Sequence, residues 1–352
     1  MALNQGQPAG RLPGADGAGL LLGDDLIADE VIPGISHYRL AARRLRRDRT
    51  AIGFGLLFLL IVAACLLAPV YSHDVAHIGP NVNNVTGTIQ VNGRTVNVVS
   101  LQGIPIGPTW HASYFFGADA LGRDVAVRLL YGGRTSLAIG FMAAAITMIF
   151  GVAVGLVAGY YRGVVDGVLA RLLDIIWAYP AVLLGVAIGT SLALGGLKIG
   201  PLTIGGNSIF IPAFLIGFVY IPYVAKPIRG QVLALREREF IDAARGLACG
   251  NVRIMVREIL PNLSSTIVVF FPLIVAGAIL LEASLSFLGA GVQPPNASWG
   301  TMIQEGLPLL TTSPQLVLVP GGMLVLAILG INVFGEGVRD ALDPKSTIRL
   351  GR

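Results

Sequence analysis

The chain of 352 residues is 54% hydrophobic and only 13% charged, and its mean hydropathy is +0.73. Soluble domains are about 25% charged, so this composition excludes an ordinary soluble enzyme, and its high hydrophobicity excludes a disordered chain. A polytopic membrane protein remains, and the 46 glycines agree with closely packed membrane helices. The two cysteines, Cys65 and Cys249, lie too far apart in the sequence to indicate a disulfide framework or a zinc site.

The first segment, residues 1–34, is rich in glycine, alanine and proline and carries an acidic cluster at 24–30. No basic region precedes its short apolar run, so it lacks the pattern of a signal peptide. We predict a disordered cytoplasmic tail. Residues 35–50 follow with apolar positions at helical spacing and arginines between them. This pattern indicates either an amphipathic basic helix on the inner leaflet or a plain basic flank of the first span.

Six uncharged segments are long enough to cross a bilayer as helices, which takes about 20 apolar residues. We predict spans at 51–71, 135–159, 174–195, 208–226, 263–287 and 316–336. With the N-terminus inside, 20 of the 25 lysines and arginines fall in the inner segments, as expected for cytoplasmic loops. Both termini are therefore expected in the cytoplasm, and the net charge of +5 reflects topology rather than nucleic-acid binding.

The first external loop, residues 72–133, contains two runs of alternating residues around Asn92-Gly93. Asn-Gly between alternating runs is a strong hairpin signal, so we predict a small β-hairpin at 88–98. Such a hairpin either covers the loop or contacts a partner.

The segment between the fourth and fifth spans, residues 227–262, is polar, amphipathic and helical in its pattern. We expect Pro227 to open it, Pro261 to close it, and Gly246 and Gly250 to break it in the middle. A membrane protein does not need a long helical loop in order to span the bilayer. Docking to a cytoplasmic partner is its simplest physical use.

Motifs for self-contained chemistry are absent from the sequence. None of the three lysines belongs to a phosphate-binding Walker A loop, and no metalloprotease or nucleophile-elbow motif occurs. We therefore expect no catalytic residue, no metal site and no cofactor bound by this chain. Arg171 and Asp174, three residues apart at the inner mouth of the third span, are expected to pair on one helix face.

Glu282 is the one acidic residue well inside a predicted span. A carboxylate at that depth is costly, so it should face other helices or a water-filled cavity. There it either contacts substrate or fixes the helix by hydrogen bonding. The candidates for a translocation pathway or gate are Glu282, Ser284, Ser286 and Gln293.

The loop at 227–262 also carries a family resemblance. Asp242–Ala248, followed by Ile259-Leu260-Pro261, resembles the EAA motif of permease subunits of bacterial ABC importers, with Asp242 in place of glutamate and Ala248 where glycine is usual. Other stretches in the family's order are Phe116–Val125, Gly159–Asp166, Arg171–Asp174, Ser286–Gly289, Gln293–Pro295, Trp299–Gly300 and Gly337–Lys345. Together they resemble the second, C-type permease of dipeptide, oligopeptide and nickel importers.

The resemblance leaves out the N-terminal tail and the insert with the hairpin, and it implies a type I importer permease with a core at 135–345. Together with the six spans and the hairpin read from the sequence pattern, the expected fold is an all-α polytopic membrane protein with a small external β-hairpin. The resemblance also implies a bacterial inner-membrane location and an ATP-driven import of di- or oligopeptides. The implied partners are a second permease in a heterodimer, two ATP-binding subunits that hold ATP and Mg, an extracytoplasmic substrate-binding protein and the lipid bilayer. The residues implied in coupling to the ATPase are Glu239, Asp242, Ala243, Ala244, Arg245, Gly246, Ala248 and Gly250.

Two other classes of protein remain open from the residues alone. A stand-alone secondary transporter needs ion sites near the bilayer midplane and usually inverted repeats, and the sequence shows neither clearly. A structural membrane scaffold leaves the loop at 227–262 unexplained. The sequence does not specify the substrate.

Overall fold

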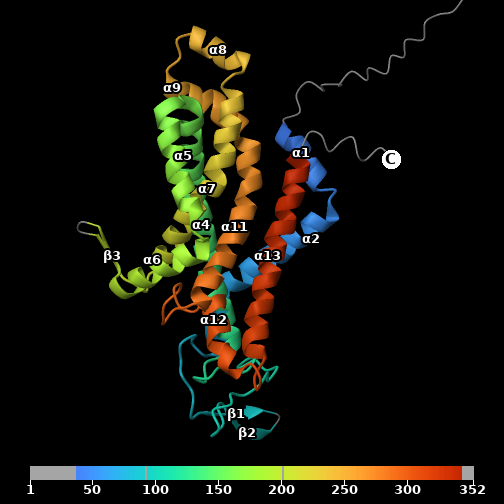
Figure 1. Ribbon diagram of the computed structural model, residues 1–352. Helices are drawn as coiled ribbons and strands as arrows, with labels where there is room; N and C mark the ends of the chain where they lie inside the picture. Colours follow the sequence, from blue (N-terminus) through green and yellow to red (C-terminus); the bar gives the residue numbers. More distant parts are fainter. Residues whose placement is uncertain (1–36, 92, 200–201, 343–352) are drawn as a thin grey trace, which may run out of the picture.

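The computed structural model describes residues 37–91, 93–199 and 202–342, which are largely helical (Figure 1). The tail predicted at 1–34 lies outside the described residues. The first elements are α1 (His37–Leu45), α2 (Arg49–Leu66), α3 (Ala68–Val70), the π-helical turn η1 (Tyr71–Ala76), β1 (Thr88–Val91), β2 (Arg94–Asn97), α4 (Val125–Tyr161), α5 (Gly163–Ala178) and α6 (Ala181–Gly195). The others are β3 (Leu197–Ile199), β4 (Leu202–Ile204), α7 (Phe210–Leu235), α8 (Glu239–Gly246), α9 (Asn251–Arg253), the π-helical turn η2 (Ile254–Ile259), α10 (Leu260–Asn262), α11 (Ser264–Phe287), α12 (Trp299–Gly306), the 3-10 turn η3 (Leu307–Leu309) and α13 (Gln315–Leu342).

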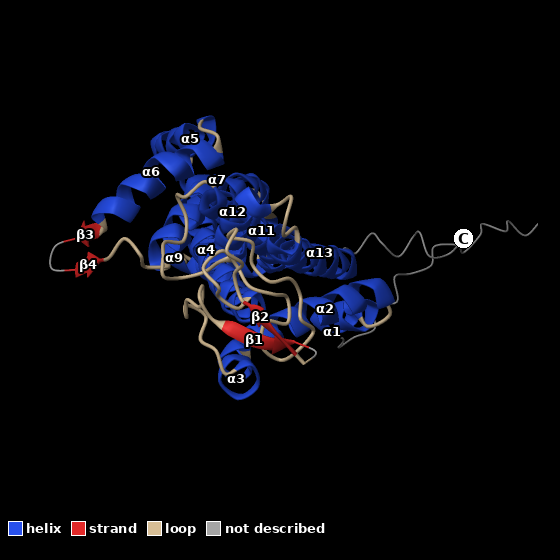
Figure 2. Cartoon of the chain, turned by 90° about the horizontal axis from the view of Figure 1, so that it is seen from below, coloured by secondary structure: helices blue, strands red, loops and turns tan. Residues whose placement is uncertain are grey.

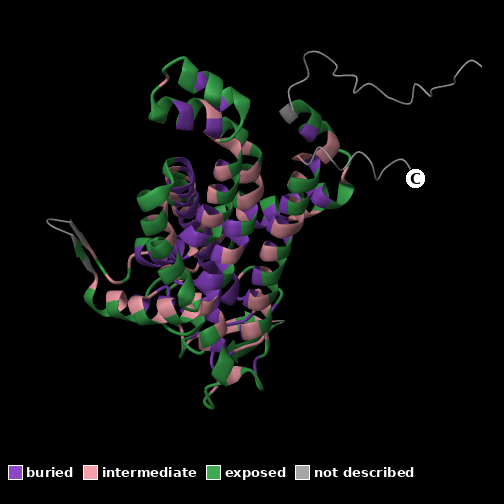
Figure 3. Cartoon of the chain, turned by 45° about the horizontal axis from the view of Figure 1, so that its top comes forward, coloured by how far each residue is buried: buried purple, intermediate pink, exposed green. Residues whose placement is uncertain are grey.

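Five helices in the described part of the chain, α2, α4, α7, α11 and α13, are long and apolar enough to cross a membrane. α5 and α6 are long and apolar enough to cross a membrane only when they are taken together. They then give a sixth candidate span, with a bend of 86° between the two helices. Figure 3 shows the long helices buried where they face one another at the centre of the bundle and exposed on the outside. The predicted class, an all-helical polytopic protein with a small β-hairpin, is confirmed.

The prediction of one continuous helix over 174–195 is wrong. α5 ends at Ala178, and Tyr179 is extended with ψ 135°. Pro180 follows, and a residue before proline is disfavoured in the helical region. Proline also has no N–H to continue the helical ladder. The chain therefore turns sharply between α5 and α6.

The segment before the first span is shorter than the helix predicted at 35–50. α1 ends at Leu45, and α2 begins at Arg49 after a turn. Asp48 separates the two helices because its side chain accepts a hydrogen bond from the N–H of Ala51 and so caps α2. The span predicted at 51–71 consists of α2 followed by α3 and the beginning of η1.

The helix predicted at 135–159 begins ten residues earlier, at Val125, so the external loop predicted at 72–133 ends at Asp124. Asp124 caps α4 through hydrogen bonds from the N–H groups of Ala126 and Val127. Arg128 and Arg134 suggested a loop in the sequence. Both belong to the first turns of α4, and Arg128 is paired with carboxylates.

α7 continues through Pro227 to Leu235, so the prediction that Pro227 opens the polar loop is wrong. Prolines are tolerated inside membrane helices because neighbouring groups satisfy the freed carbonyls. The loop between α7 and α11 therefore spans residues 236–263, with α8, α9, η2 and α10 inside it.

The hairpin predicted at 88–98 is present. β1 and β2 pair antiparallel from Thr88 opposite Asn97 to Val91 opposite Arg94. Gly93, in the turn, has φ 77°, a conformation that glycine adopts without strain. β3 and β4 form a second antiparallel hairpin that the sequence did not predict.

α6 leaves the bundle sideways and leads to β3 and β4 (Figure 2). Gly185 and Gly189, one helical turn apart, allow it to pack closely near the end of α11. A Cβ atom on Gly185 would lie 2.7 Å from Leu285 Cδ2, and one on Gly189 would lie 2.5 Å from the Ala290 carbonyl oxygen. The outer side of α6 is exposed, with Leu183 and Leu194 as its most exposed apolar side chains.

α4 and α7 pack along each other at the centre of the bundle. Gly151, Gly155 and Gly159 recur every four residues on the contact face of α4. A Cβ atom on Gly155 would lie 2.6 Å from the Ala225 carbonyl oxygen, and one on Gly159 would lie 2.6 Å from Val232 Cβ. Small residues at this spacing let two membrane helices approach until their backbones are in contact.

We predict that Gly155→Ala destabilises the protein, because the atom it meets is backbone and cannot turn aside. Overpacking of this kind costs about 1–3 kcal/mol. Gly53→Ala on α2 is the matched control, since a Cβ there meets nothing within 4 Å. Thermal unfolding of the purified protein in detergent measures both variants. Equal melting temperatures for the two would contradict the close-packing argument.

Candidate functional site

The loop between α7 and α11 lies at the end of the bundle that also holds α1 and the end of α13 (Figure 1). α8 is its best-formed helix. Glu239 and Asp242 occupy the first turn and Arg245 the last. Negative charge at the N-terminus and positive charge at the C-terminus interact favourably with the helix dipole. Arg245 Nη1 also lies 2.9 Å from Asp242 Oδ1, three residues earlier on the same face.

α8 ends in a Schellman motif, a left-handed turn closed by two backbone hydrogen bonds. The N–H of Cys249 donates to the Ala244 carbonyl at 3.1 Å, and the N–H of Ala248 donates to the Arg245 carbonyl at 2.9 Å. Ala248 accordingly has φ 53°. This is the position where the family pattern usually has glycine, and the conformation explains why. The predicted break between Gly246 and Gly250 is present.

The two faces of α8 have different surroundings. Ile241 and Ala244 face inward and belong to the hydrophobic core together with Ile254 and Ile259. The two neighbouring alanines of the motif therefore differ, since Ala244 is buried and Ala243 is exposed. The residues implied in coupling that lie at the surface are Glu239, Asp242, Ala243, Arg245, Gly246, Ala248 and Gly250.

An exposed apolar stripe lies on the outer face of α8. It consists of Phe240, Ala243 and Leu247, spaced by three and four residues, and Leu247 is 80% exposed. Sequence reasoning missed Phe240 and Leu247, although apolar residues at helical spacing in a polar loop were the available signal. An exposed apolar stripe with a charged rim is typical of a docking surface.

Polar contacts join the loop to the ends of α4 and α5. The Tyr160 hydroxyl donates to Asn251 Oδ1 at 2.9 Å, and Arg236 donates to the Tyr160 carbonyl. Arg162, between α4 and α5, pairs with Glu237 at 2.8 Å. A displacement of the loop would therefore act directly on α4.

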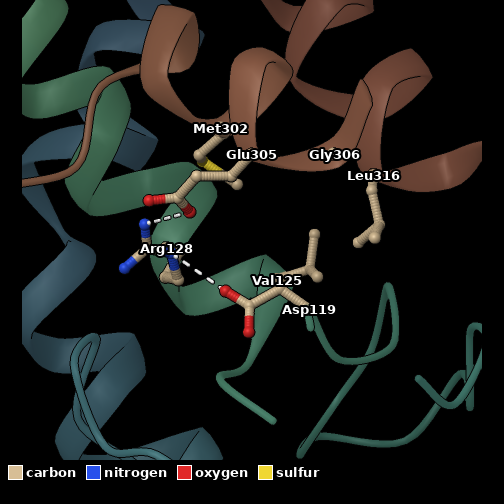
Figure 4. Close-up of a pocket in the computed structure, with 7 residues that line it drawn as sticks. All are labelled: Asp119, Val125, Arg128, Met302, Glu305, Gly306 and Leu316. Carbon is tan, nitrogen blue, oxygen red and sulfur yellow. Dashed lines mark hydrogen bonds and ion pairs between the residues drawn. The ribbon is translucent and has the colours of Figure 1, made fainter. Parts of the chain in front are cut away.

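At the opposite end of the bundle, four charged side chains form a cluster: Asp119, Arg123, Arg128 and Glu305. Figure 4 shows three of them, Asp119, Arg128 and Glu305. Arg123 pairs with Asp119 and with Glu305 of α12, both at 2.6 Å. Arg128 of α4 pairs with Glu305 at 2.9 Å, and its side chain is only 2% exposed. The cluster surrounds a cavity of about 10 Å³, room for a single water molecule.

Asp124 extends this region toward the external loop. Besides capping α4, its carboxylate accepts a hydrogen bond from the N–H of Tyr114. Burial raises the pKa of Asp124, and the N–H donors of Tyr114, Val127 and Ala126 oppose that rise. The Asp119-to-Asp124 part of the sequence resemblance is therefore a structural joint, which fastens the external loop to α4 and α12.

Glu282 is fully buried on α11. Ser286 Oγ donates to its Oε1 at 2.6 Å, and Ser136 and Ser298 face the same carboxyl group from α4 and from the N-cap of α12. Its Oε2 has no hydrogen-bond partner among the described residues. Within this chain, Glu282 therefore faces other helices, the first of the two environments expected for it.

The other pathway candidates do not gather around Glu282, apart from Ser286. The Ser284 hydroxyl donates to the Leu280 carbonyl of its own helix at 2.8 Å. The Gln293 amide donates to the carbonyls of Gly289 and Gly291, each at 3.1 Å. A role of these four residues in a translocation pathway stays a prediction.

The long apolar helices of the bundle, with a polar loop that carries an amphipathic helix at one end, define the class of multi-pass helical membrane proteins. The chain belongs to the family of binding-protein-dependent transport system inner membrane components, whose model matches residues 151–348. A second model, the N-terminal TM domain of oligopeptide transport permease C, matches residues 36–85. The protein is therefore a multi-pass inner-membrane protein.

The chain is similar to curated members along most of its length. It is 34% identical to the dipeptide transport system permease protein DppC of Alkalihalophilus pseudofirmus, over 88% of this chain and 91% of the relative. It is 33% identical to the oligopeptide transport system permease protein OppC of Bacillus subtilis, over 88% and 90%. It is also 33% identical to the glutathione transport system permease protein GsiD of Pectobacterium atrosepticum, over 86% and 89%. A chain of the MetNI methionine ABC transporter in an inward-facing conformation aligns at 17% identity with a TM-score of 0.49, over 61% of this chain and 96% of that chain.

We predict that Ala248→Gly tightens the end of α8, because glycine avoids the cost of a left-handed conformation, about 1–2 kcal/mol for other residues. Hydrogen–deuterium exchange at the Ala244–Cys249 amides should become slower. Ala243→Gly is the matched control. It sits in the regular part of the same helix and should make exchange faster. Faster exchange in Ala248→Gly would argue against the strained cap.

We predict that Arg128→Met lowers the melting temperature strongly, because Glu305 and Asp119 then share Arg123 alone and the cluster keeps an uncompensated negative charge. Removing one partner of a buried ion pair costs about 3–5 kcal/mol. Arg134→Met, the same change at an exposed position of α4, should have little effect. An equal fall in melting temperature in both variants would show that the ion pairs of the cluster do not stabilise the protein.

Proposed function

We propose that this chain is the membrane permease subunit of an ATP-driven importer of peptides and forms half of the translocation pathway. The printed functions of its relatives, dipeptide, oligopeptide and glutathione transport, support peptides as the substrate class. The observation that carries the coupling role is the apolar stripe of α8, whose three residues are exposed in this chain. An exposed apolar surface rimmed by charged residues typically marks a site where another protein binds.

The partner of α8 in this proposal is an ATP-binding subunit. Two such subunits hold the ATP and Mg, and this chain has no catalytic site of its own. A second permease pairs with this chain as a heterodimer in the type I importer arrangement, and an extracytoplasmic binding protein delivers the peptide. The family description, which names dependence on a binding protein, supports the last of these partners.

The proposed topology places both termini and α8 in the cytoplasm. The distribution of lysines and arginines supports this orientation. The fold is consistent with it, because α8 and α1 lie at one end of the bundle and the β1–β2 hairpin at the other (Figure 1). The hairpin then faces the side from which the binding protein approaches.

Transmission of the ATP-driven movement follows from the contacts of the loop. When the ATPases close, they displace α8, and the Tyr160–Asn251 and Arg162–Glu237 contacts transfer the displacement to α4 and α5. Because α4 packs tightly on α7, these helices move as one body. The pathway then switches between inward- and outward-facing states.

We predict that Leu247→Asp uncouples transport while leaving the fold intact, since Leu247 contributes nothing to the core. Peptide uptake by the complete transporter in proteoliposomes should fall about tenfold or more, as for a central interface residue. Leu247→Met, which keeps the apolar surface, should transport normally. ATP-driven uptake at the wild-type rate by an assembled Leu247→Asp transporter would refute the docking role of the stripe.

A further inference from the structure

Two ion pairs link α5 to the inner half of α7. Arg229 donates to both oxygens of Asp166, and these side chains are 32% and 16% exposed. Lys226 Nζ lies 2.8 Å from Asp174 Oδ1, and these side chains are more open, at 36% and 56%. The pairing expected between Arg171 and Asp174 is therefore replaced by a pairing between helices.

Aromatic side chains complete the more open pair. Lys226 Nζ sits 4.3 Å from the centre of the Trp177 ring, and Trp177 stacks on Tyr223 with centroids 4.6 Å apart and an angle of 17°. Trp177 and Tyr223 are both exposed. We call Asp174, Lys226, Trp177 and Tyr223 the α5–α7 patch.

Lipid is a poor neighbour for the α5–α7 patch. Lys226 lies nine residues before the end of α7, about 14 Å along the helix. Charged side chains within a membrane-spanning helix normally face other helices or water, because hydrocarbon solvates them badly. This side of the bundle is therefore suited to a water-filled path.

The chemistry of the patch matches the two ends of a free peptide. A peptide carries an ammonium group at one terminus and a carboxylate at the other, and the patch offers one carboxylate, one ammonium group and two flat apolar rings. An exposed ion pair contributes little to stability, so its partners separate easily when better ones arrive. The bidentate and less exposed Asp166–Arg229 pair is not suited to such an exchange.

We propose that the α5–α7 patch contacts the transported peptide, with Asp174 receiving its amino terminus and Lys226 its carboxylate. Trp177 and Tyr223 contact the peptide between these two ends. No covalent step is involved, because one set of ion pairs replaces another. This assignment rests on the proposed function, since it names a contact site inside the peptide pathway.

Cysteine labelling tests whether the patch faces water. In a Cys65→Ala/Cys249→Ser background, Asp174→Cys is compared with Val168→Cys, an exposed position on another side of α5. The complete transporter in lipid nanodiscs is treated with a charged, membrane-impermeant methanethiosulfonate. We expect Asp174→Cys to react much faster than Val168→Cys. An unreactive Asp174→Cys would mean that lipid or the second permease covers the patch, and it would overturn the proposal.

Exchange of the two charges tests the contact itself. The double variant Asp174→Lys/Lys226→Asp keeps an ion pair but reverses its direction along the path. Uptake of a tryptic casein digest into proteoliposomes, measured by mass spectrometry, should fall about tenfold, equivalent to about 1.4 kcal/mol. Assembly and melting temperature should be unchanged. Wild-type uptake by the double variant would show a purely structural pair and overturn the proposal.

The wild-type transporter separates this inference from the function on which it rests. If it imports peptides from the digest and the double variant does so equally well, only the assignment of the patch fails. If the wild-type transporter with its ATPases and binding protein imports no peptide at all, the proposed function fails first.

Discussion

The structure depends on the close contact of α4 and α7. Helices in a bilayer gain nothing from leaving water, so their association relies on close packing, and glycines at four-residue spacing provide it along α4. α4 has 37 residues and is therefore about 55 Å long. It carries the charged cluster with Arg128 near its first turn and the loop contact through Tyr160 near its last turn. One helix therefore joins the two ends of the molecule at which partner proteins are proposed to bind.

The two ends differ in the forces that fix them. At the outer end, Arg123 and Arg128 share two carboxylates in a largely buried cluster with no net charge, which resists displacement because moving one side chain would break several ion pairs at once. At the other end, buried side chains such as Ile241 anchor the α8 loop in the core. Hydrogen bonds and one surface ion pair join the loop to the end of α4, and these polar contacts break and re-form more easily. The molecule thus combines a rigid external joint with an adjustable loop, as expected of a subunit that receives mechanical work at one end.

The sequence predicted what depends on composition and local pattern. The apolar segments, the Asn-Gly hairpin and the break between Gly246 and Gly250 all appear, because short-range chemistry determines them. The sequence did not predict the features that depend on contacts between residues far apart in the chain. Arg128 looked like a loop residue because its partner Glu305 is 177 positions away, and Asp174 pairs with Lys226 rather than with Arg171. The outward direction of Phe240 and Leu247 also depends on which face of α8 the core covers.

The 86° bend between α5 and α6 has a consequence for biogenesis. Residues 174–195 form an apolar stretch that the insertion machinery reads as one membrane segment. In the folded protein α6 points away from the axis of α5 and packs against α11 and the turn that follows it. Gly185 contacts Leu285, and Gly189 contacts Ala290. Those contact residues are synthesised about 100 positions later. The bend therefore forms late in assembly, after the fifth span has entered the bilayer, because α6 packs against that span.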